Sequence, residues 1–274
     1  MTAAPTLKDK PEDTAAATRH RPPGPLVPIV TTAASLLMLC LMWALAAVLW
    51  QSRAFPSPLD VWDVLVREAA SGALFFHLGM TLGRVAAAYV VAMAFGSVIG
   101  ILLGSHRRAD RFFNPWVTLF LNIPALVVIV LAYIWFGLNE AAAVGAVAVN
   151  KIPNVAVTMR EGARALDPRY AEMAAVYRFS MLDRVRHILL PQLPPYFAVA
   201  SRSGIALIWK IVLVVELLGR SNGVGFQIHL YFQLFDVAAI LAYTLAFVAV
   251  MLLVELFLVQ PLERHATRWR RNPA

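Results

Sequence analysis

The chain has 274 residues, of which 60% are apolar and only 15% are charged, and its mean hydropathy is +0.68. A soluble domain is nearer half apolar and a quarter charged, so these values exclude an ordinary soluble domain. The net charge of +8 does not indicate a nucleic-acid-binding domain, because the positive residues flank apolar runs and form no separate basic region. The apolar runs are long enough to cross a bilayer and predict an integral membrane protein.

Residues 1–25 are polar and rich in Ala, Thr and Pro, which predicts a disordered tail. The apolar run that follows, Leu26–Trp50, is too long for a signal peptide and is interpreted as a retained membrane anchor. Ser57 and Pro58 then form a helix start. The helix after them has Leu59, Trp62, Leu65 and Val66 on one face, so it is amphipathic. It is either a helix that lies at the membrane surface or an ordinary helix of a loop, with its polar side facing outward.

Six apolar runs are expected to span the membrane as α-helices, and residues 219–236 between the last two are expected to form a loop. The third run is interrupted at Asn122-Ile123-Pro124 and the fourth at Asn150–Asn154, because the residue before a proline resists the α conformation. The six runs are Leu26–Trp50, Leu78–Gly104, Phe113–Phe136, Ala141–Met159, Tyr196–Leu218 and Val237–Leu258.

The second run contains three glycines four residues apart, Gly96, Gly100 and Gly104. Small residues at this spacing share one helix face and allow two helix backbones to approach closely. We therefore expect a helix-packing face here, and the face favours a homodimer.

Lys and Arg are distributed unequally between the two sides of these six spans, and this bias predicts the orientation of the chain. Seventeen of them fall on the side of both termini and only three on the other side, so we expect both termini in the cytoplasm. The seventeen are Lys8, Lys10, Arg19, Arg21, Arg107, Arg108, Arg111, Arg160, Arg164, Arg169, Arg178, Arg184, Arg186, Arg264, Arg268, Arg270 and Arg271, and the three are Arg53, Arg67 and Arg220.

A charged segment, residues 160–194, separates the fourth and fifth spans on the cytoplasmic side. Asp167-Pro168 starts one short helix, and Ser180 with Asp183 forms a capping-box start for a second, which Pro191 is expected to stop. The pattern predicts two short helices with a corner at Phe179-Ser180. A short amphipathic helix without a core needs a partner surface, which is either another protein or the membrane domain of this chain itself.

This segment resembles the cytoplasmic coupling motif of ABC-importer permeases: Glu-Ala-Ala, three residues, Gly, nine residues, Ile-x-Leu-Pro. Aligned on Ile188 and Pro191, its Glu falls on Glu172 and its second Ala on Ala174. Its Gly falls on Arg178, so we expect Arg178 to turn the corner in another geometry or to add a charge contact to a partner. The coupling residues that the resemblance implies are Glu172, Ala174, Arg178, Ser180, Asp183, Ile188 and Pro191.

Other short stretches follow in the same order as in the nitrate/sulfonate/taurine branch of these permeases, over residues 55–263. They include Thr81-Leu82-Gly83-Arg84-Val85, Asn122-Ile123-Pro124, Trp135–Glu140, Leu166–Arg169, Ser201-Arg202, Glu216 and Asn222-Gly223-Val224-Gly225.

The resemblance implies an all-α polytopic permease of the type I importer fold in the bacterial inner membrane, with residues 26–262 as the membrane domain and residues 263–274 as a basic tail. It implies a homodimer, two cytoplasmic ATPase subunits that bind ATP and Mg²⁺, a periplasmic binding protein and a small anion as substrate. No phosphate-binding G-x-x-x-x-G-K-[ST] loop occurs in the chain, so no cofactor is expected to bind here and ATP hydrolysis belongs to a separate chain. The chain itself is not expected to be an enzyme.

Polar and charged residues within the spans are candidates for the pathway, because a charge at mid-span costs roughly 2.5–3.5 kcal/mol and usually faces a cavity or a partner. Two lysines would suit an anionic substrate, although Lys151 or Lys210 could instead pair with Glu216 across helices or snorkel. The candidates are Asn122, Asn150, Lys151, Asn154, Lys210 and Glu216.

The alternatives to an ABC permease are an ATP-independent secondary transporter or channel and a membrane-embedded enzyme. No internal repeat supports the transporter or channel, and no catalytic or metal-ligand cluster in the sequence supports the enzyme.

Overall fold

A computed structural model describes residues 26–50, 52, 54–166 and 168–261. The expected tails at residues 1–25 and 263–274, and Asp167 at the start of the first short helix, lie outside the described residues. The chain divides into two compact units, residues 1–49 and 50–274. All but the last residue of α1, Leu26–Trp50, lies in the first unit, and α1 is a continuous helix with the predicted bounds.

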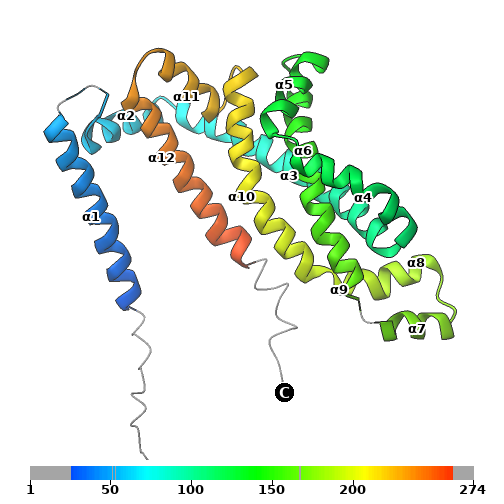
Figure 1. Cartoon of the computed structure of the whole chain (residues 1–274). Helices are drawn as coiled ribbons and strands as arrows, with labels where there is room; N and C mark the ends of the chain where they lie inside the picture. The colour runs from blue at the N-terminus through cyan, green and yellow to red at the C-terminus, as the bar shows by residue number, and fades with distance from the viewer. Residues whose placement is uncertain (1–25, 51, 53, 167, 262–274) are drawn as a thin grey trace, which may run out of the picture. The chain divides into compact units, whose positions relative to one another are not determined.

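Every element of the described part of the second unit is helical, which confirms the all-α polytopic fold (Figure 1). Five of the described helices are long and apolar enough to cross a membrane, or up to six if a bent pair counts as one span. In the second unit the elements are α2 Pro58–Ala70, α3 Ala73–Ser105, α4 Arg107–Asn122, α5 Ala125–Phe136, α6 Glu140–Arg164, α7 Pro168–Val176, α8 Met181–Arg184, a π-helical turn Val185–Leu189, α9 Leu190–Gln192, α10 Pro194–Gly219, α11 Val224–Gln233, α12 Val237–Val254 and a second π-helical turn Glu255–Val259.

Of the two predicted interruptions by proline, the structure confirms the first and contradicts the second. Helices α4 and α5 are bent by 94° at Asn122-Ile123-Pro124, which confirms the break in the third span. The expected interruption of the fourth span is wrong, because α6 runs through Pro153 without a break. Pro153 is buried, and packing by neighbouring helices compensates the backbone hydrogen bond that a proline removes within a membrane.

Helix α6 lies at the centre of the second unit and packs against α3, α5 and α10 (Figure 1). The glycine face of α3 is the reason that α3 and α6 approach closely. A Cβ on Gly96 would lie 2.6 Å from Val155 Cβ, one on Gly100 would lie 2.4 Å from the carbonyl oxygen of Ala156, and one on Gly104 would lie 2.6 Å from Ala163 Cβ. The predicted packing face is confirmed, but it packs within the chain, so the glycines give no support to a homodimer.

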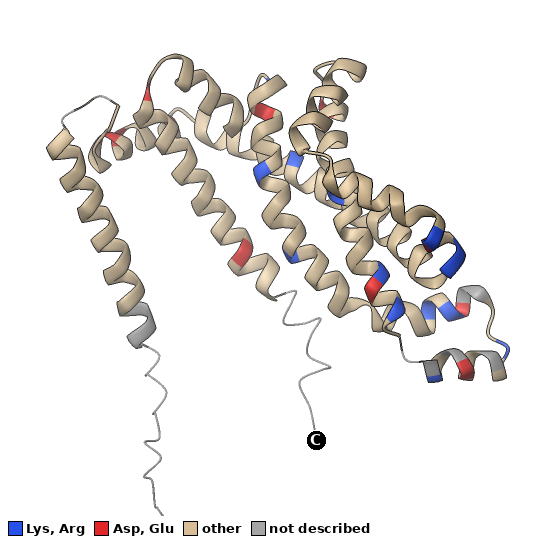
Figure 2. Ribbon diagram, viewed as in Figure 1, with Lys and Arg blue, Asp and Glu red and all other residues tan. Residues whose placement is uncertain are grey.

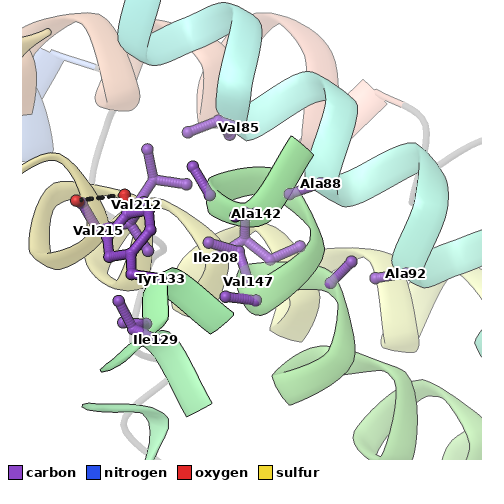
Figure 3. Close-up of a cluster of buried hydrophobic side chains, with 13 residues drawn as sticks. Val85, Ala88, Ala92, Ile129, Tyr133, Ala142, Val147, Ile208, Val212 and Val215 are labelled. Carbon is purple, nitrogen blue, oxygen red and sulfur yellow. Dashed lines mark hydrogen bonds between the residues drawn. The ribbon is translucent and has the colours of Figure 1, made fainter. Parts of the chain in front are cut away.

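A buried apolar cluster fills the space between α3, α5, α6 and α10 (Figure 3). Val85 and Ala88 of α3 and Val147 of α6 are among its members. The hydroxyl of Tyr133 crosses the cluster and donates to the backbone oxygen of Val215 at 2.9 Å, so the one polar atom of this aromatic side chain is satisfied. This cluster fixes the helices on which the charged groups described below are placed.

Helix α2 begins as predicted. Ser57 and Asp60 form a capping box, and the hydrogen bonds donated by the Ser57 hydroxyl and N–H lower the pKa of the Asp60 carboxyl. The helix buries Val61 and Val64, whereas Leu59, Trp62 and Val66 of the predicted face are exposed.

The predicted loop at residues 219–236 is wrong, because it contains the helix α11. Its N-cap, Gly223, has φ +110°, a conformation that glycine adopts without a steric penalty. The stretch Asn222–Gly225, which lies within the expected loop, therefore leads into the first residues of a helix. Helix α11 packs against α10 and α12.

Candidate functional site

An ionic network that is buried at Arg84 and Glu216 and exposed at Glu140 joins α3, α6, α10 and the segment before α11. Arg84 of α3 is its centre: Nη1 donates to Glu216 Oε1 at 2.6 Å, and Nε and Nη2 donate to the Glu140 carboxylate at 2.8 and 2.7 Å. Its guanidinium also donates to the backbone and side-chain oxygens of Asn222. Arg220 adds a second cation, 2.5 Å from Glu140. We call these five residues the Arg84 network.

Glu216 is fully buried, and three groups of the described chain donate hydrogen bonds to its carboxylate. Besides Arg84, the hydroxyl of Thr81 and the N–H of Gly225 donate to Oε2, both at 2.9 Å. A Cβ on Gly223 would lie 2.3 Å from the Glu216 carboxyl carbon, so the segment before α11 can fold onto Glu216 only because this residue is glycine. The alternative in which Lys151 or Lys210 pairs with Glu216 is therefore wrong, since the ionic partner of Glu216 is Arg84.

A second layer of hydrogen bonds extends the network to residues that the sequence did not single out. His77, one helical turn before Thr81, accepts the N–H of Gly223 through Nδ1 at 3.0 Å. Its Nε2 lies 2.6 Å from the side-chain amide of Gln227. His77 was not among the candidate residues drawn from the sequence. The available signal was its position on the same face of α3 as Thr81 and Arg84.

The Arg84 network brings together sequence stretches that are far apart in the chain. Thr81 and Arg84, Glu140, Glu216 and the Asn222–Gly225 stretch each belong to a different one of the matching stretches. Because buried charges require paired and hydrogen-bonded partners, a change in one of these stretches would leave the others unsatisfied. The network ties the N-terminal end of α6 and the C-terminal end of α10 to α3.

The six pathway candidates are not brought together. Glu216 belongs to the Arg84 network, and Lys210 is exposed on α10, with Nζ 5.4 Å from the ring centroid of Trp209. Asn122 is exposed at the end of α4 and donates to the backbone oxygen of Thr118 at 2.7 Å. The other three lie on α6: Asn150 and Asn154 are half-buried, and Lys151 is buried.

The charged segment after α6 forms two short helices with a corner, as predicted. Helix α7 ends at Val176 and α8 begins at Met181. Ser180 caps α8 by accepting the N–H of Asp183 at 3.2 Å, and its hydroxyl donates to the Asp183 carboxylate at 2.6 Å. Ala174 and Ile188 are buried, whereas Glu172 and Asp183 are exposed.

Pro191 does not stop the second helix. A π-helical turn follows α8, and the chain remains helical to Gln192, with Pro191 in the first turn of α9. Pro191 lies one residue before the end of this continuous helical segment and directly follows the π-helical turn, in which the N–H of Leu190 donates to the oxygen of Val185. The expected stop is therefore wrong, and it is replaced by a shift of helical register at residues 185–189.

Arg178 turns the corner in the geometry that was thought to require glycine. Its φ is +51°, in the left-handed region, and the N–H of Phe179 donates to the carbonyl of Ala174 at 2.9 Å, the long bond of a Schellman motif. Our expectation of another geometry is wrong. The left-handed conformation costs a non-glycine residue about 1–2 kcal/mol of free energy, and Arg178 adopts it despite this cost.

Charged side chains gather where α4 begins, where α6 ends and along α7 and α8 (Figure 2). Asp110 of α4 accepts hydrogen bonds from Arg160 and Arg164 of α6, the first at 3.1 Å. These pairs fix the C-terminal end of α6, from which the chain continues to α7. Among the described residues, no three His, Cys, Asp or Glu side chains cluster as metal ligands would.

Comparison with known proteins yields a family match over much of the chain. The family model described as "Binding-protein-dependent transport system inner membrane component" matches residues 92–269. The match includes α4 to α12 and therefore the corner at Arg178 and the part of the Arg84 network that lies on α6, α10 and the segment before α11.

Curated relatives and solved structures agree with this match. The putative aliphatic sulfonates transport permease protein SsuC of Bacillus subtilis (strain 168) is 28% identical over 79% of this chain and 78% of its own length. The taurine transport system permease protein TauC of Escherichia coli (strain K12) is 25% identical over 85% of this chain and 86% of its own. A structure of the MetNI methionine ABC transporter in inward-facing conformations contains a chain with a similar fold, with a TM-score of 0.62 at 18% identity over 77% of this chain and all of that one.

Proposed function

Because this chain belongs to the family of binding-protein-dependent transport system inner membrane components, the ABC-importer permeases, we propose that it forms the translocation pathway of an ATP-driven importer for a small anion. Two copies form the pathway, and two cytoplasmic ATPase subunits bind ATP and Mg²⁺ and drive it. A periplasmic binding protein delivers the substrate. The chain itself binds no cofactor.

The anionic substrate is supported by the names of the relatives and by the charges within the spans. Both curated relatives described above are named for the transport of sulfonates or taurine. Lys151 and Lys210 place positive charge within α6 and α10, where a charge usually faces a cavity or a partner. Nitrate, a sulfonate or taurine would each be attracted by these two lysines.

The observation that carries the proposal is the exposed surface of the segment α7–α8, which lies outside the candidate spans. Tyr170, Val176 and Tyr177 are 47%, 78% and 72% exposed, beside the exposed carboxylate of Glu172. Exposed apolar side chains on a short helix that has charged residues beside them are typical of a surface that binds another protein. The ATPase subunit is the partner we propose for this surface.

The test is to weaken this surface and measure the attachment of the ATPase. We expect that Glu172→Ala, or a short deletion within residues 181–189, releases the ATPase during purification or separates ATP hydrolysis from transport. The measurements are the yield of ATPase that co-purifies from native membranes and the ratio of ATP hydrolysed to substrate taken up in proteoliposomes.

Asp63→Ala on α2 is the matched control, since Asp63 is also an exposed carboxylate on a short helix but lies outside this segment. It should leave ATPase co-purification at the wild-type level. Full transport and normal co-purification in both segment variants would show that the segment α7–α8 does not bind the ATPase.

A further inference from the structure

Helix α4 carries a polar stripe along its whole length. Five polar or positive residues lie three or four positions apart, a spacing that puts them on one face of a helix. They are Arg107, Arg111, Asn114, Thr118 and Asn122, and all are exposed. Because α4 and α5 together form one bent candidate span, this stripe runs along a helix that enters the membrane.

Helix α6, which is itself a candidate span, carries a second polar stripe. Asn150, Asn154 and Thr158 lie four positions apart on it and are half-buried. Helices α4 and α6 pack against each other, and Nη1 of Arg160 on α6 donates to the Asn114 side-chain oxygen at 2.7 Å. The two stripes are therefore on neighbouring helices.

An apolar groove shows that the two stripes lie on the same side of this helix pair. The groove, of about 520 Å³, lies between α3, α4 and α6, and Phe113, Phe120, Ile152 and Ala156 are among its lining residues. Each of these four follows a residue of a stripe by two positions, and residues two apart on a helix point about 200° away from each other. Since the groove is on the side of α3, both stripes lie on the side away from α3.

The polar side chains of the stripes have unused hydrogen-bonding capacity. The side-chain amides of Asn150 and Asn154 make no hydrogen bond to any other described residue. Asn122 donates to the backbone oxygen of Thr118 at 2.7 Å, and its own side-chain oxygen accepts nothing from the described residues. Lipid chains offer no hydrogen bonds, so such a side of a helix pair turns toward water, a polar solute or another chain.

One end of the α4 stripe is positively charged. Arg107 and Arg111 have no carboxylate partner among the described residues, and the carboxylate beside them, Asp110, is paired with Arg160 and Arg164 of α6. Figure 2 shows these positive residues gathered where α4 begins and α6 ends. Positive charge without a partner at the end of a polar surface raises the local concentration of anions.

We propose that this polar side of α4 and α6 is the wall along which the transported anion crosses the membrane, and that Arg107 and Arg111 select for negative charge where α4 begins. The inference rests on the proposed function and names the residues that this chain contributes to the pathway. The amide and hydroxyl groups donate to the anion in turn. Because each group is neutral, the anion is bound weakly at several places, as release from a pathway requires.

Reaction of introduced cysteines with water-soluble reagents tests the wall. In a Cys40→Ser background, Thr118→Cys and Asn154→Cys are placed on the stripes, and Phe120→Cys in the groove is the matched control, since Phe120 is also exposed on α4. Each variant is purified with its ATPase in nanodiscs and treated with an anionic (sulfonatoethyl) or a cationic (trimethylammonioethyl) methanethiosulfonate. We expect both stripe cysteines to react with the anionic reagent at least about tenfold faster than Phe120→Cys, because the groove side offers no water.

The charge selection is tested by the ratio of the two reaction rates. At Thr118→Cys the anionic reagent should react faster than the cationic one, and Arg111→Gln should lower this ratio by about threefold or more, because a positive charge about 10 Å along the helix is lost. Arg67→Gln on α2 changes the net charge equally but lies outside the α4–α6 pair, so it should leave the ratio unchanged. Asn114→Cys and Thr158→Cys replace any first variant that does not assemble.

Two results would overturn the proposal. If the stripe cysteines react no faster than Phe120→Cys, this side is dry and is covered by a second copy or by lipid. If they react quickly but without preference for the anionic reagent, or if Arg111→Gln leaves the preference intact, the wall does not select anions. Either result leaves the proposed function intact as long as the ATPase co-purifies, whereas an absent ATPase refutes the proposed function whatever the cysteines show.

Discussion

At the scale of single residues, Arg84 joins three parts of the chain that are far apart in the sequence. Its guanidinium donates to residues that are 56, 132 and 138 positions away in the sequence. Its own side chain is 4% exposed and that of Glu216 is 0% exposed. A buried ion pair of this kind adds little net stability compared with an apolar pair, but it is costly to break, because the remaining charge is left buried without a partner.

We expect Arg84→Met to destabilise the permease by about 3–5 kcal/mol, because Glu216 then keeps a buried charge whose ionic partner is gone. The thermal unfolding midpoint of the purified protein, measured by tryptophan fluorescence, reports this loss.

The matched variant is the double substitution Arg84→Met with Glu216→Leu, which removes both charges. It should recover most of the lost stability, because no buried charge remains. A double variant as unstable as the single one would mean that the hydrogen bonds to Asn222 and Glu140, rather than the pair with Glu216, hold this region together.

At the scale of elements, the contact between α3 and α6 depends on glycines that differ in their surroundings. A Cβ on Gly100 would meet backbone atoms of Ala156, whereas one on Gly83, on the same helix, would meet nothing within 4 Å. The two positions therefore separate the effect of helix packing from the effect of helix propensity.

Gly100→Ala should destabilise the permease by about 1–3 kcal/mol, because the backbone of α6 must move to accommodate the added methyl group. Gly83→Ala should be neutral, or stabilising by up to about 1 kcal/mol through helix propensity. Thermal unfolding of the two variants side by side measures the difference, and equal midpoints would contradict the close approach of α3 and α6.

The sequence predicted the elements better than it predicted the site. Apolar runs and caps such as Ser57 are local signals, and they predicted the spans, the bend at Pro124 and the corner near Ser180. The continuity of α6 through Pro153 and the helix α11 depend on packing by other helices, which no local pattern records. The Arg84 network was missed for the same reason: its members were visible one by one, but their convergence is a property of the fold.

At the scale of the whole molecule, the charged groups separate into two sets along the second unit. The residues of the Arg84 network lie where α6 begins and where α10 ends. The basic residues around α4, α7 and α8 lie where α6 ends (Figure 2). This separation supports an orientation in which α7 and α8 face the cytoplasm.

Cysteine labelling can test this orientation, because Cys40 is the only native cysteine. In a Cys40→Ser background, Phe235→Cys and Tyr177→Cys place thiols at residues that are 85% and 72% exposed. We expect a membrane-impermeant maleimide to label Phe235→Cys in intact cells, and Tyr177→Cys only after permeabilisation. The reverse pattern would contradict the orientation.

The long reach of Arg84 has a consequence for how the protein is made. A ribosome synthesises Arg84 before it reaches Glu140, and both before Glu216 and Asn222. Helix α3 therefore enters the membrane with an uncompensated guanidinium, at a cost of roughly 2.5–3.5 kcal/mol. The length of α3, 33 mostly apolar residues, offsets this cost until the acceptors have been synthesised. A nascent chain that stops before residue 140 has none of these acceptors for Arg84, whereas one that stops between residues 140 and 216 has Glu140 alone as its ionic acceptor.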